Sequence, residues 1–124
     1  KTGRADSNVV AWANRVATGT LYVSAITLLE IEFGIRSLQR RDQPRAAILR
    51  AWMQGHVLPA FEGRVLPVDT AVALQCAQLH VPNRRTERDA LIAAPAIVHG
   101  MTVVTRNVDD FEGTGAALIN PWLP

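Results

Sequence analysis

Three acidic residues share one local sequence context. These residues are Glu30, Asp89 and Asp110. Each follows, by three positions, a residue of a type that commonly caps helices, namely Thr27, Thr86 and Asn107. A carboxylate in that position either accepts backbone N–H groups at a helix start, as in a capping box, or is free to bind a ligand beside the helix. The spacing alone leaves both interpretations open.

Short apolar runs alternate with helical patterns along the chain. Strands are predicted at Leu21–Ile26, Val65–Val68, Met101–Val104 and Ala117–Ile119. Helices are predicted over Val9–Val16, from Thr27 to about Arg41, from Pro44 to near Gly55, over Thr70–His80 and over about Glu87–His99, which ends at Gly100. Strands that alternate with helices indicate an α/β fold with a parallel sheet covered on both faces.

This architecture gives the acids a common position. Helices that follow parallel strands begin at the carboxyl edge of the sheet, where ligands bind, so Glu30, Asp89 and Asp110 are expected to converge there. Their neighbours are mostly Ile, Leu and Ala, and carboxylates that meet in an apolar cleft repel one another unless a cation is present. Oxygen-rich sites suit Mg²⁺ or Mn²⁺. Such an ion, with arginines nearby, is an arrangement that cleaves phosphodiesters.

The composition sets bounds on the protein class. A chain of 124 residues, 48% hydrophobic and 19% charged, predicts a single globular domain over residues 1–124. No apolar stretch reaches the roughly 20 residues of a membrane span. The single cysteine, Cys76, excludes an internal disulfide and a multi-cysteine zinc site. A cytoplasmic protein is expected.

The formal charge of +2 does not identify a nucleic-acid binder by itself. Arginines gather in two stretches, which contain Arg36, Arg40, Arg41, Arg45 and Arg50, and then Arg84, Arg85 and Arg88. Arginine binds two phosphate oxygens at once with its planar guanidinium. A solvated helical face explains the same stretches equally well.

Other reactive residue types fit structural roles. Cys76 is expected to pack inside a helix, His99 to end a helix, and Asp69 to cap one. Asp42 and Asp109 are expected to be surface charges. The three tryptophans are expected in the core or at an interface, and no glycine-rich phosphate loop occurs.

Several motifs, in order, resemble those of PIN-domain toxins of the VapBC and FitAB kind. The segment Ser24–Glu30 with Gly34 resembles their second-acid motif, and Asp89–Ala94 resembles the third. Thr105–Asn107 followed by Asp110-Phe111 resembles the fourth motif. Val9–Trp12 resembles the first helix of the family, and Asn120–Trp122 resembles its common ending. The resemblance covers essentially the whole chain.

The resemblance implies a PIN-like three-layer sandwich with a central parallel sheet between helices. It implies that Glu30, Asp89 and Asp110 are metal-binding and catalytic carboxylates, that Asn107 belongs to the rim or water network of the site, and that Thr105 contacts a metal-bound water or the phosphate. The implied protein is the toxin of a type II toxin–antitoxin system. It would be a homodimer that cleaves RNA endonucleolytically with Mg²⁺ or Mn²⁺, and a cognate antitoxin would neutralise it by lying across the acidic groove.

Two departures from the family pattern stand out. The family opens with a strand that ends in Asp-Thr-Asn, but no apolar strand precedes Asp6, and alignment of Val9–Trp12 places Asp6 in a loop. The first strand and its aspartate are therefore expected upstream of Lys1. Pro95 falls inside the helix that carries Asp89, where an interior proline costs about 3 kcal/mol and kinks a helix.

Two alternative functions remain open at this point. One is a catalytically incompetent PIN-fold module that binds antitoxin or RNA without cutting. The other is a metal-dependent phosphohydrolase that acts on small phosphate esters. The residues encoded before Lys1 would separate the enzyme from the binding module.

Overall fold

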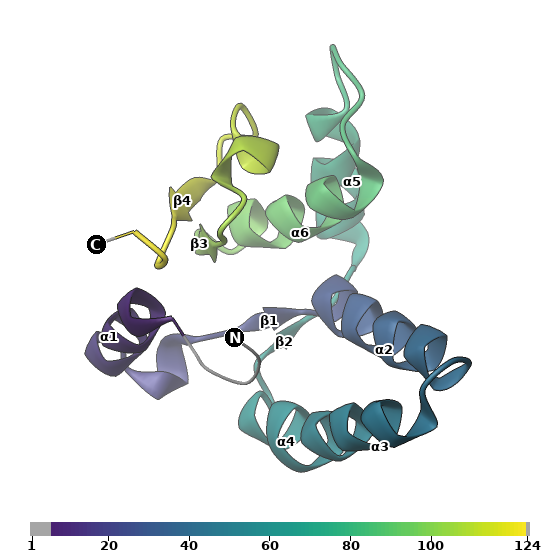
Figure 1. Cartoon of the computed structure of the whole chain (residues 1–124). Coiled ribbons are helices and arrows are strands. Elements are labelled where there is room, and N and C mark those ends of the chain that lie inside the picture. Colours follow the sequence, from purple (N-terminus) through teal and green to yellow (C-terminus); the bar gives the residue numbers. More distant parts are fainter. Residues whose placement is uncertain (1–5, 124) are drawn as a thin grey trace. The chain divides into compact units, whose positions relative to one another are not determined.

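The computed structural model describes residues 6–123, and residues 1–5 and 124 lie outside this range. The chain forms two compact units, of which one is the segment Tyr22–Pro67 and the other combines Lys1–Leu21 with Val68–Pro124. Figure 1 shows the elements of both units in chain order.

The segment Tyr22–Pro67 contains a helical hairpin between two short strands. Its elements are β1 (Val23–Ser24), α2 (Ala25–Gln39), α3 (Gln43–Trp52), the π-helical turn η2 (Met53–Val57), α4 (Leu58–Ala60) and β2 (Val65–Leu66). The strands pair in parallel, with Val23 opposite Val65, and α2 packs against α3 (Figure 1). Buried Ile35, Met53 and Val57 form the core of this unit.

The second unit contains the remaining elements. These are α1 (Ser7–Arg15), the 3₁₀ turn η1 (Thr18–Thr20), α5 (Thr70–Leu79), α6 (Glu87–Val98), β3 (Thr102–Val104), the 3₁₀ turn η3 (Val108–Phe111) and β4 (Ala117–Ile119). Strands β3 and β4 pair in parallel, with Val103 opposite Leu118. The parallel pairing in both units agrees with the predicted α/β class.

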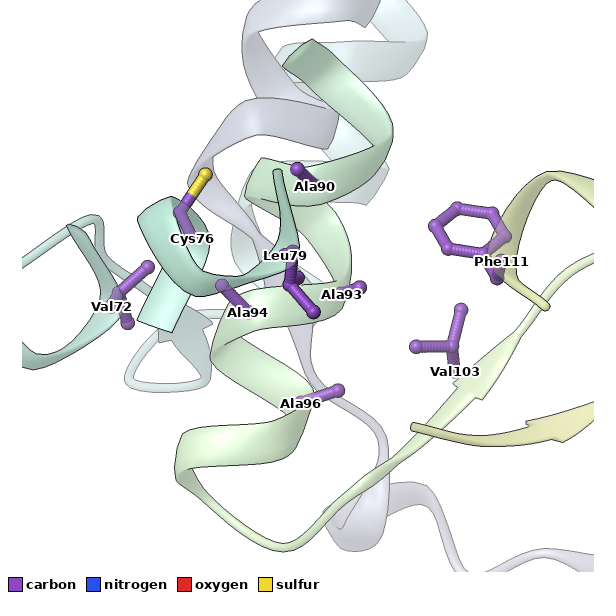
Figure 2. Packing of buried hydrophobic residues seen from close by; sticks show 9 residues of the cluster. All are labelled: Val72, Cys76, Leu79, Ala90, Ala93, Ala94, Ala96, Val103 and Phe111. Carbon is purple, nitrogen blue, oxygen red and sulfur yellow. The ribbon is translucent and has the colours of Figure 1, made fainter. Parts of the chain in front are cut away.

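Small residues on α6 bring its neighbours close together. Ala90, Ala93 and Ala94 are fully buried, and Figure 2 shows the alanines of α6 between the side chains of α5 and those of Val103 and Phe111. Alanine has a high helix propensity and a small side chain. The sequence ALIAAPA therefore builds a helix that packs closely on the two segments beside it.

The structure corrects several predicted element boundaries. Helix α2 begins at Ala25 rather than Thr27, because the Ser24 hydroxyl accepts a hydrogen bond of 3.0 Å from the N–H of Ile26. Strand β1 is therefore shorter than the predicted Leu21–Ile26. Helix α3 does not stop near Gly55, because the chain continues through η2 into α4.

Other predicted boundaries are confirmed. The Asp69 carboxylate caps α5 by accepting a bond of 3.0 Å from the N–H of Val72. Helix α6 ends beside Gly100, which has a φ of 65°, a conformation that favours glycine. Helix α6 also continues through buried Pro95, and the N–H of His99 donates to the Pro95 carbonyl at 3.0 Å.

None of the helices within residues 6–123 combines the length and the apolar character that crossing a membrane requires.

Candidate functional site

Glu30 is held on the second turn of α2. The helix starts at Ala25 with Ser24 as its cap, so Thr27 lies inside the helix and cannot form a capping box with Glu30. The capping interpretation of this acid is therefore wrong. The Glu30 side chain is half-buried, and the adjacent Ile31 packs against the core of its unit.

Asp89 lies in the first turn of α6 together with Glu87. Thr86 precedes the helix, but its side chain makes no capping hydrogen bond, so the reciprocal capping box is absent here too. The partial positive charge of the helix N-terminus favours an ionised carboxylate in this turn. Ala90, the next residue, is fully buried, which fixes the backbone directly beside Asp89.

Asp110 is carried by the turn η3. Its N–H donates to the carbonyl of Asn107 at 3.1 Å, while the Asn107 side chain makes no capping bond. Asp110 is exposed, and the adjacent Phe111 is only 5% exposed. The buried ring anchors the turn and leaves the neighbouring carboxylate at the surface.

The second unit brings the segments of two predicted site acids together. Ala90 and Phe111, the neighbours of Asp89 and Asp110, belong to one buried cluster (Figure 2), and α6 contacts η3. Glu30 belongs to the segment Tyr22–Pro67. Within either unit, as far as residues 6–123 describe it, no three His, Cys, Asp or Glu side chains gather closely enough to hold a metal ion.

The predicted accessory residues lie in the loop between β3 and η3. The Thr105 hydroxyl accepts a hydrogen bond of 3.0 Å from the N–H of Asn107, and the N–H of Thr105 donates to the Ile119 carbonyl at 2.9 Å. The Asn120 side chain donates to the carbonyl of Arg106 at 3.3 Å. The loop before Asp110 is therefore fastened to β4 and to the C-terminal motif.

That C-terminal motif is itself held in place. The N–H of Trp122 donates to Asn120 Oδ1 at 2.9 Å, and the Trp122 carbonyl accepts from Asn8 Nδ2 of α1 at 2.8 Å. The Arg106 guanidinium lies 5.8 Å from the centre of the Trp122 ring, within cation–π range. Trp122 is half-buried, so it supports the loop that leads to η3.

Asp6 has a structural role. It is the N-cap of α1, and its carboxylate accepts hydrogen bonds from the N–H groups of Asn8 and Val9 at 2.8 and 3.4 Å. The prediction that Asp6 lies just before the first helix is confirmed.

Some arginines of the first stretch bind acids of their own unit. Arg36 donates to Glu32 at 2.5 Å, and Arg50 of α3 donates to the other Glu32 oxygen. The hydrogen bond from Arg50, and then that from Arg36, lowers the pKa of Glu32. Asp42 accepts from the N–H of Arg45 at 3.2 Å as the cap of α3, which corrects its assignment as a plain surface charge.

Glu32 and Glu30 lie on different sides of α2, because residues two apart on a helix do not face each other. The i, i+4 spacing of Glu32 and Arg36 was a visible signal for this pair in the sequence. Its second partner, Arg50, depends on the packing of α2 against α3.

Cys76 and His99 have the predicted structural roles. Cys76 is 8% exposed within the core of its unit. Burial, and then the charge of Glu87, raises the pKa of its thiol, which keeps it protonated and a poor nucleophile at neutral pH. His99 is the C-cap of α6.

The role of Arg85 could not be predicted from the sequence. Its guanidinium donates to two backbone carbonyls, those of Leu79 at 3.2 Å and Glu112 at 3.0 Å. Every residue has a backbone carbonyl, so a carbonyl partner cannot be recognised from residue types. In the sequence, Arg85 is therefore only one member of a basic stretch.

Comparison with known proteins gives a consistent family. The family model described as PIN domain matches residues 3–116. The VapC ribonuclease Y4jK of Sinorhizobium fredii is 38% identical, over 96% of this chain and 87% of that protein. The toxin FitB of Neisseria gonorrhoeae is 33% identical, over 94% of this chain and 86% of that protein.

Solved structures agree with the sequence comparison. The crystal structure of FitAcB from Neisseria gonorrhoeae superposes with a TM-score of 0.89 at 31% identity, covering 98% of this chain and 90% of that one. The predicted PIN fold and the predicted class of toxin ribonuclease are thereby confirmed. The chain belongs to the PIN domain family, alongside the VapC and FitB toxins.

Proposed function

We propose that this chain is the toxin of a type II toxin–antitoxin pair and that it cleaves RNA endonucleolytically with a divalent cation. In this proposal Glu30, Asp89 and Asp110 are the metal-binding and catalytic carboxylates. The observation that carries it is the anchoring of Asp89 and Asp110. Each directly precedes a residue buried in one core, so two family acids emerge from adjoining, rigid segments.

The donor set fits the proposed cation. Carboxylate oxygens are the ligands that Mg²⁺ and Mn²⁺ prefer, and such an ion, when bound, would activate water and offset charge on the phosphate. The two aspartates would orient their oxygens from η3 and from the first turn of α6. The Thr105 hydroxyl, which accepts from Asn107 N–H, keeps its own hydrogen to donate to a phosphate oxygen or a water.

The residues three positions before the acids do not form their half of a capping box. Thr27 lies inside α2, and the side chains of Thr86 and Asn107 make no capping bonds. The PIN motifs in which the three acids stand give a second reason for their shared spacing in the sequence.

The experiment is a set of charge-removing substitutions in the complete natural protein. Glu30→Gln, Asp89→Asn and Asp110→Asn should each lower Mg²⁺-dependent RNA cleavage by more than about 100-fold, because even residues that only orient metal ligands contribute 10- to 100-fold. Cleavage of a labelled RNA under single-turnover conditions measures the rate.

Each variant has a neighbour as its matched control. Glu32→Gln, Glu87→Gln and Asp109→Asn remove the same charge within two residues and should leave the cleavage rate close to that of the wild type. Full activity in all three site variants would exclude the proposed mechanism.

A binding module without catalysis is the second candidate. This candidate keeps the PIN fold and its acidic motifs but does not cleave RNA. This candidate predicts that the complete protein binds antitoxin or RNA tightly while RNA stays intact at saturating Mg²⁺ and Mn²⁺. Metal-dependent cleavage that the three substitutions abolish would exclude it.

The proposed assembly and location follow from the same family. The protein would form a homodimer, and a cognate antitoxin would cover its acidic residues. Its RNA substrate would place it in the cytoplasm, where RNA is available. Analytical ultracentrifugation of the protein with and without antitoxin tests the dimer, since a monomer at micromolar concentration would contradict it.

A further inference from the structure

Arg85 connects three separate segments of its unit. It lies in the loop between α5 and α6, and its own N–H donates to His80 Nδ1 at 3.0 Å. Its Nε donates to the Leu79 carbonyl at 3.2 Å, and its Nη1 donates to the Glu112 carbonyl at 3.0 Å. The half-buried side chain of Arg85 thus connects its own loop before α6 with the end of α5 and with the end of η3.

Both carbonyls lie where helical elements end. Leu79 is the last residue of α5, and Glu112 is the C-cap of η3. Carbonyls at such ends lack intrahelical donors and carry partial negative charge. The planar guanidinium donates in fixed, diverging directions, so it satisfies both carbonyls only when the two ends keep one relative position.

Gly113 gives the guanidinium its space. A Cβ atom at Gly113 would lie 2.7 Å from Arg85 Nη2, whereas a Cβ atom at Gly115 would meet nothing within 4 Å. Both glycines have a positive φ, 81° and 88°, so any side chain at either position strains the backbone. Only a side chain at Gly113 would also displace Arg85.

The two segments that Arg85 joins lead to the two aspartates of the unit. Its own loop runs through Thr86 into the first turn of α6, which carries Asp89, and Glu112 closes the turn that carries Asp110. We propose that Arg85 is a positioning residue that sets the spacing of the Asp89 and Asp110 carboxylates for divalent-cation binding. This inference rests on the metal-binding role proposed above.

The test measures Mn²⁺ binding directly, without RNA. Arg85→Ala in the complete protein should weaken Mn²⁺ binding about 10- to 100-fold, the usual effect of losing a group that orients metal ligands. Calorimetry, or the EPR signal of free Mn²⁺, gives the dissociation constant. Arg84→Ala removes the same charge one residue away, on an exposed side chain, and should bind Mn²⁺ like the wild type.

Two further variants separate positioning from charge and from stability. Arg85→Lys keeps the charge but loses the diverging donors, so it should also bind Mn²⁺ more weakly than the wild type. Gly113→Ala and Gly115→Ala carry the same backbone strain, so both should lower the melting temperature without metal, Gly113→Ala by the larger amount because it also disturbs the Arg85 hydrogen bonds. Only Gly113→Ala should weaken Mn²⁺ binding as well, because only its Cβ displaces the guanidinium.

The outcomes distinguish this inference from the proposed function. Equal Mn²⁺ affinity in the wild type, Arg85→Ala and Gly113→Ala would overturn the positioning role and leave the metal site intact. Absence of Mn²⁺ binding by the wild-type protein would overturn the metal site itself, and this inference with it.

Discussion

Glu32 joins two helices through its bonds to Arg36 on α2 and to Arg50 on α3. Because these bonds lower its pKa from the ordinary value of 4.5, the carboxylate ionises more readily in the folded chain than in the unfolded one. Its contribution to stability is therefore present above about pH 4.5 and is lost as the pH falls through the lower folded-state pKa.

This gives a prediction at the scale of one residue. Glu32→Gln should lower the free energy of unfolding at pH 7, and the difference from the wild type should shrink as the pH falls from 5 to 3. Urea denaturation at a series of pH values, followed by circular dichroism, measures both free energies. A difference that stays constant across the series would show that the ionised pair does not stabilise the hairpin.

At the residue scale, the sequence identified the acids better than their partners. Glu30, Asp89 and Asp110 stood out because of type and spacing, and the segments of Asp89 and Asp110 share one core. The assignment of the three acids to one metal site stays a prediction. Arg85 could not be singled out, because its partners are the carbonyls of Leu79 and Glu112, which depend on how two chain segments pack.

At the scale of an element, α5 offers a direct test of capping. The Asp69 carboxylate accepts the N–H of Val72 at 3.0 Å, so Asp69→Ala should lower the free energy of unfolding by about 1 kcal/mol. Asp69→Ser retains a capping oxygen and should lose much less. Equal losses in both variants, measured by urea denaturation, would show that the hydrogen bond is not what stabilises the helix start.

Element boundaries were predicted well where local chemistry decides them. Ala117–Ile119, the Asp69 cap and the end of α6 beside Gly100 agree with the structure. Gly55 was wrongly expected to end a helix, because Met53 and Val57 on either side of it are buried in one core. Burial of both side chains outweighs the unfavourable helix propensity of one glycine, about 1 kcal/mol.

Pro95 shows the same competition between local preference and packing. An interior proline lacks the N–H that would bond to the carbonyl four residues earlier, and the sequence alone therefore predicted a disturbed helix. In the structure, α6 extends to Val98, and Pro95 is buried among the alanines of its own helix. The buried apolar ring of Pro95 contributes to the core, and helix propensity alone does not include this contribution.

At the scale of the whole molecule, the chain leaves one unit at Leu21 and returns to it at Val68. The intervening segment has a small core, centred on Ile35, Met53 and Val57. In a segment of roughly 50 residues, a single hydrophobic core rarely supplies more than about 3–5 kcal/mol of stability. The predicted single domain over residues 1–124 therefore implies that both units unfold together.

Calorimetry tests this directly. The chain should unfold in one transition whose calorimetric and van't Hoff enthalpies agree, and a peptide covering residues 22–67 should show little stable helix by circular dichroism. Two resolved transitions, or a folded peptide, would indicate two domains instead of one.

Ser24 is at once the last residue of β1 and the N-cap of α2, so no spacer separates the strand from the helix. An insertion of one residue at this junction would rotate every later side chain of α2 by about 100° and shift it by about 1.5 Å along the axis. The Glu30 side chain would then point in another direction, although the residue itself is unchanged. For the role proposed for Glu30, the length of this junction matters in addition to the carboxylate itself, whereas the turn between α2 and α3 can vary in length without rotating Glu30.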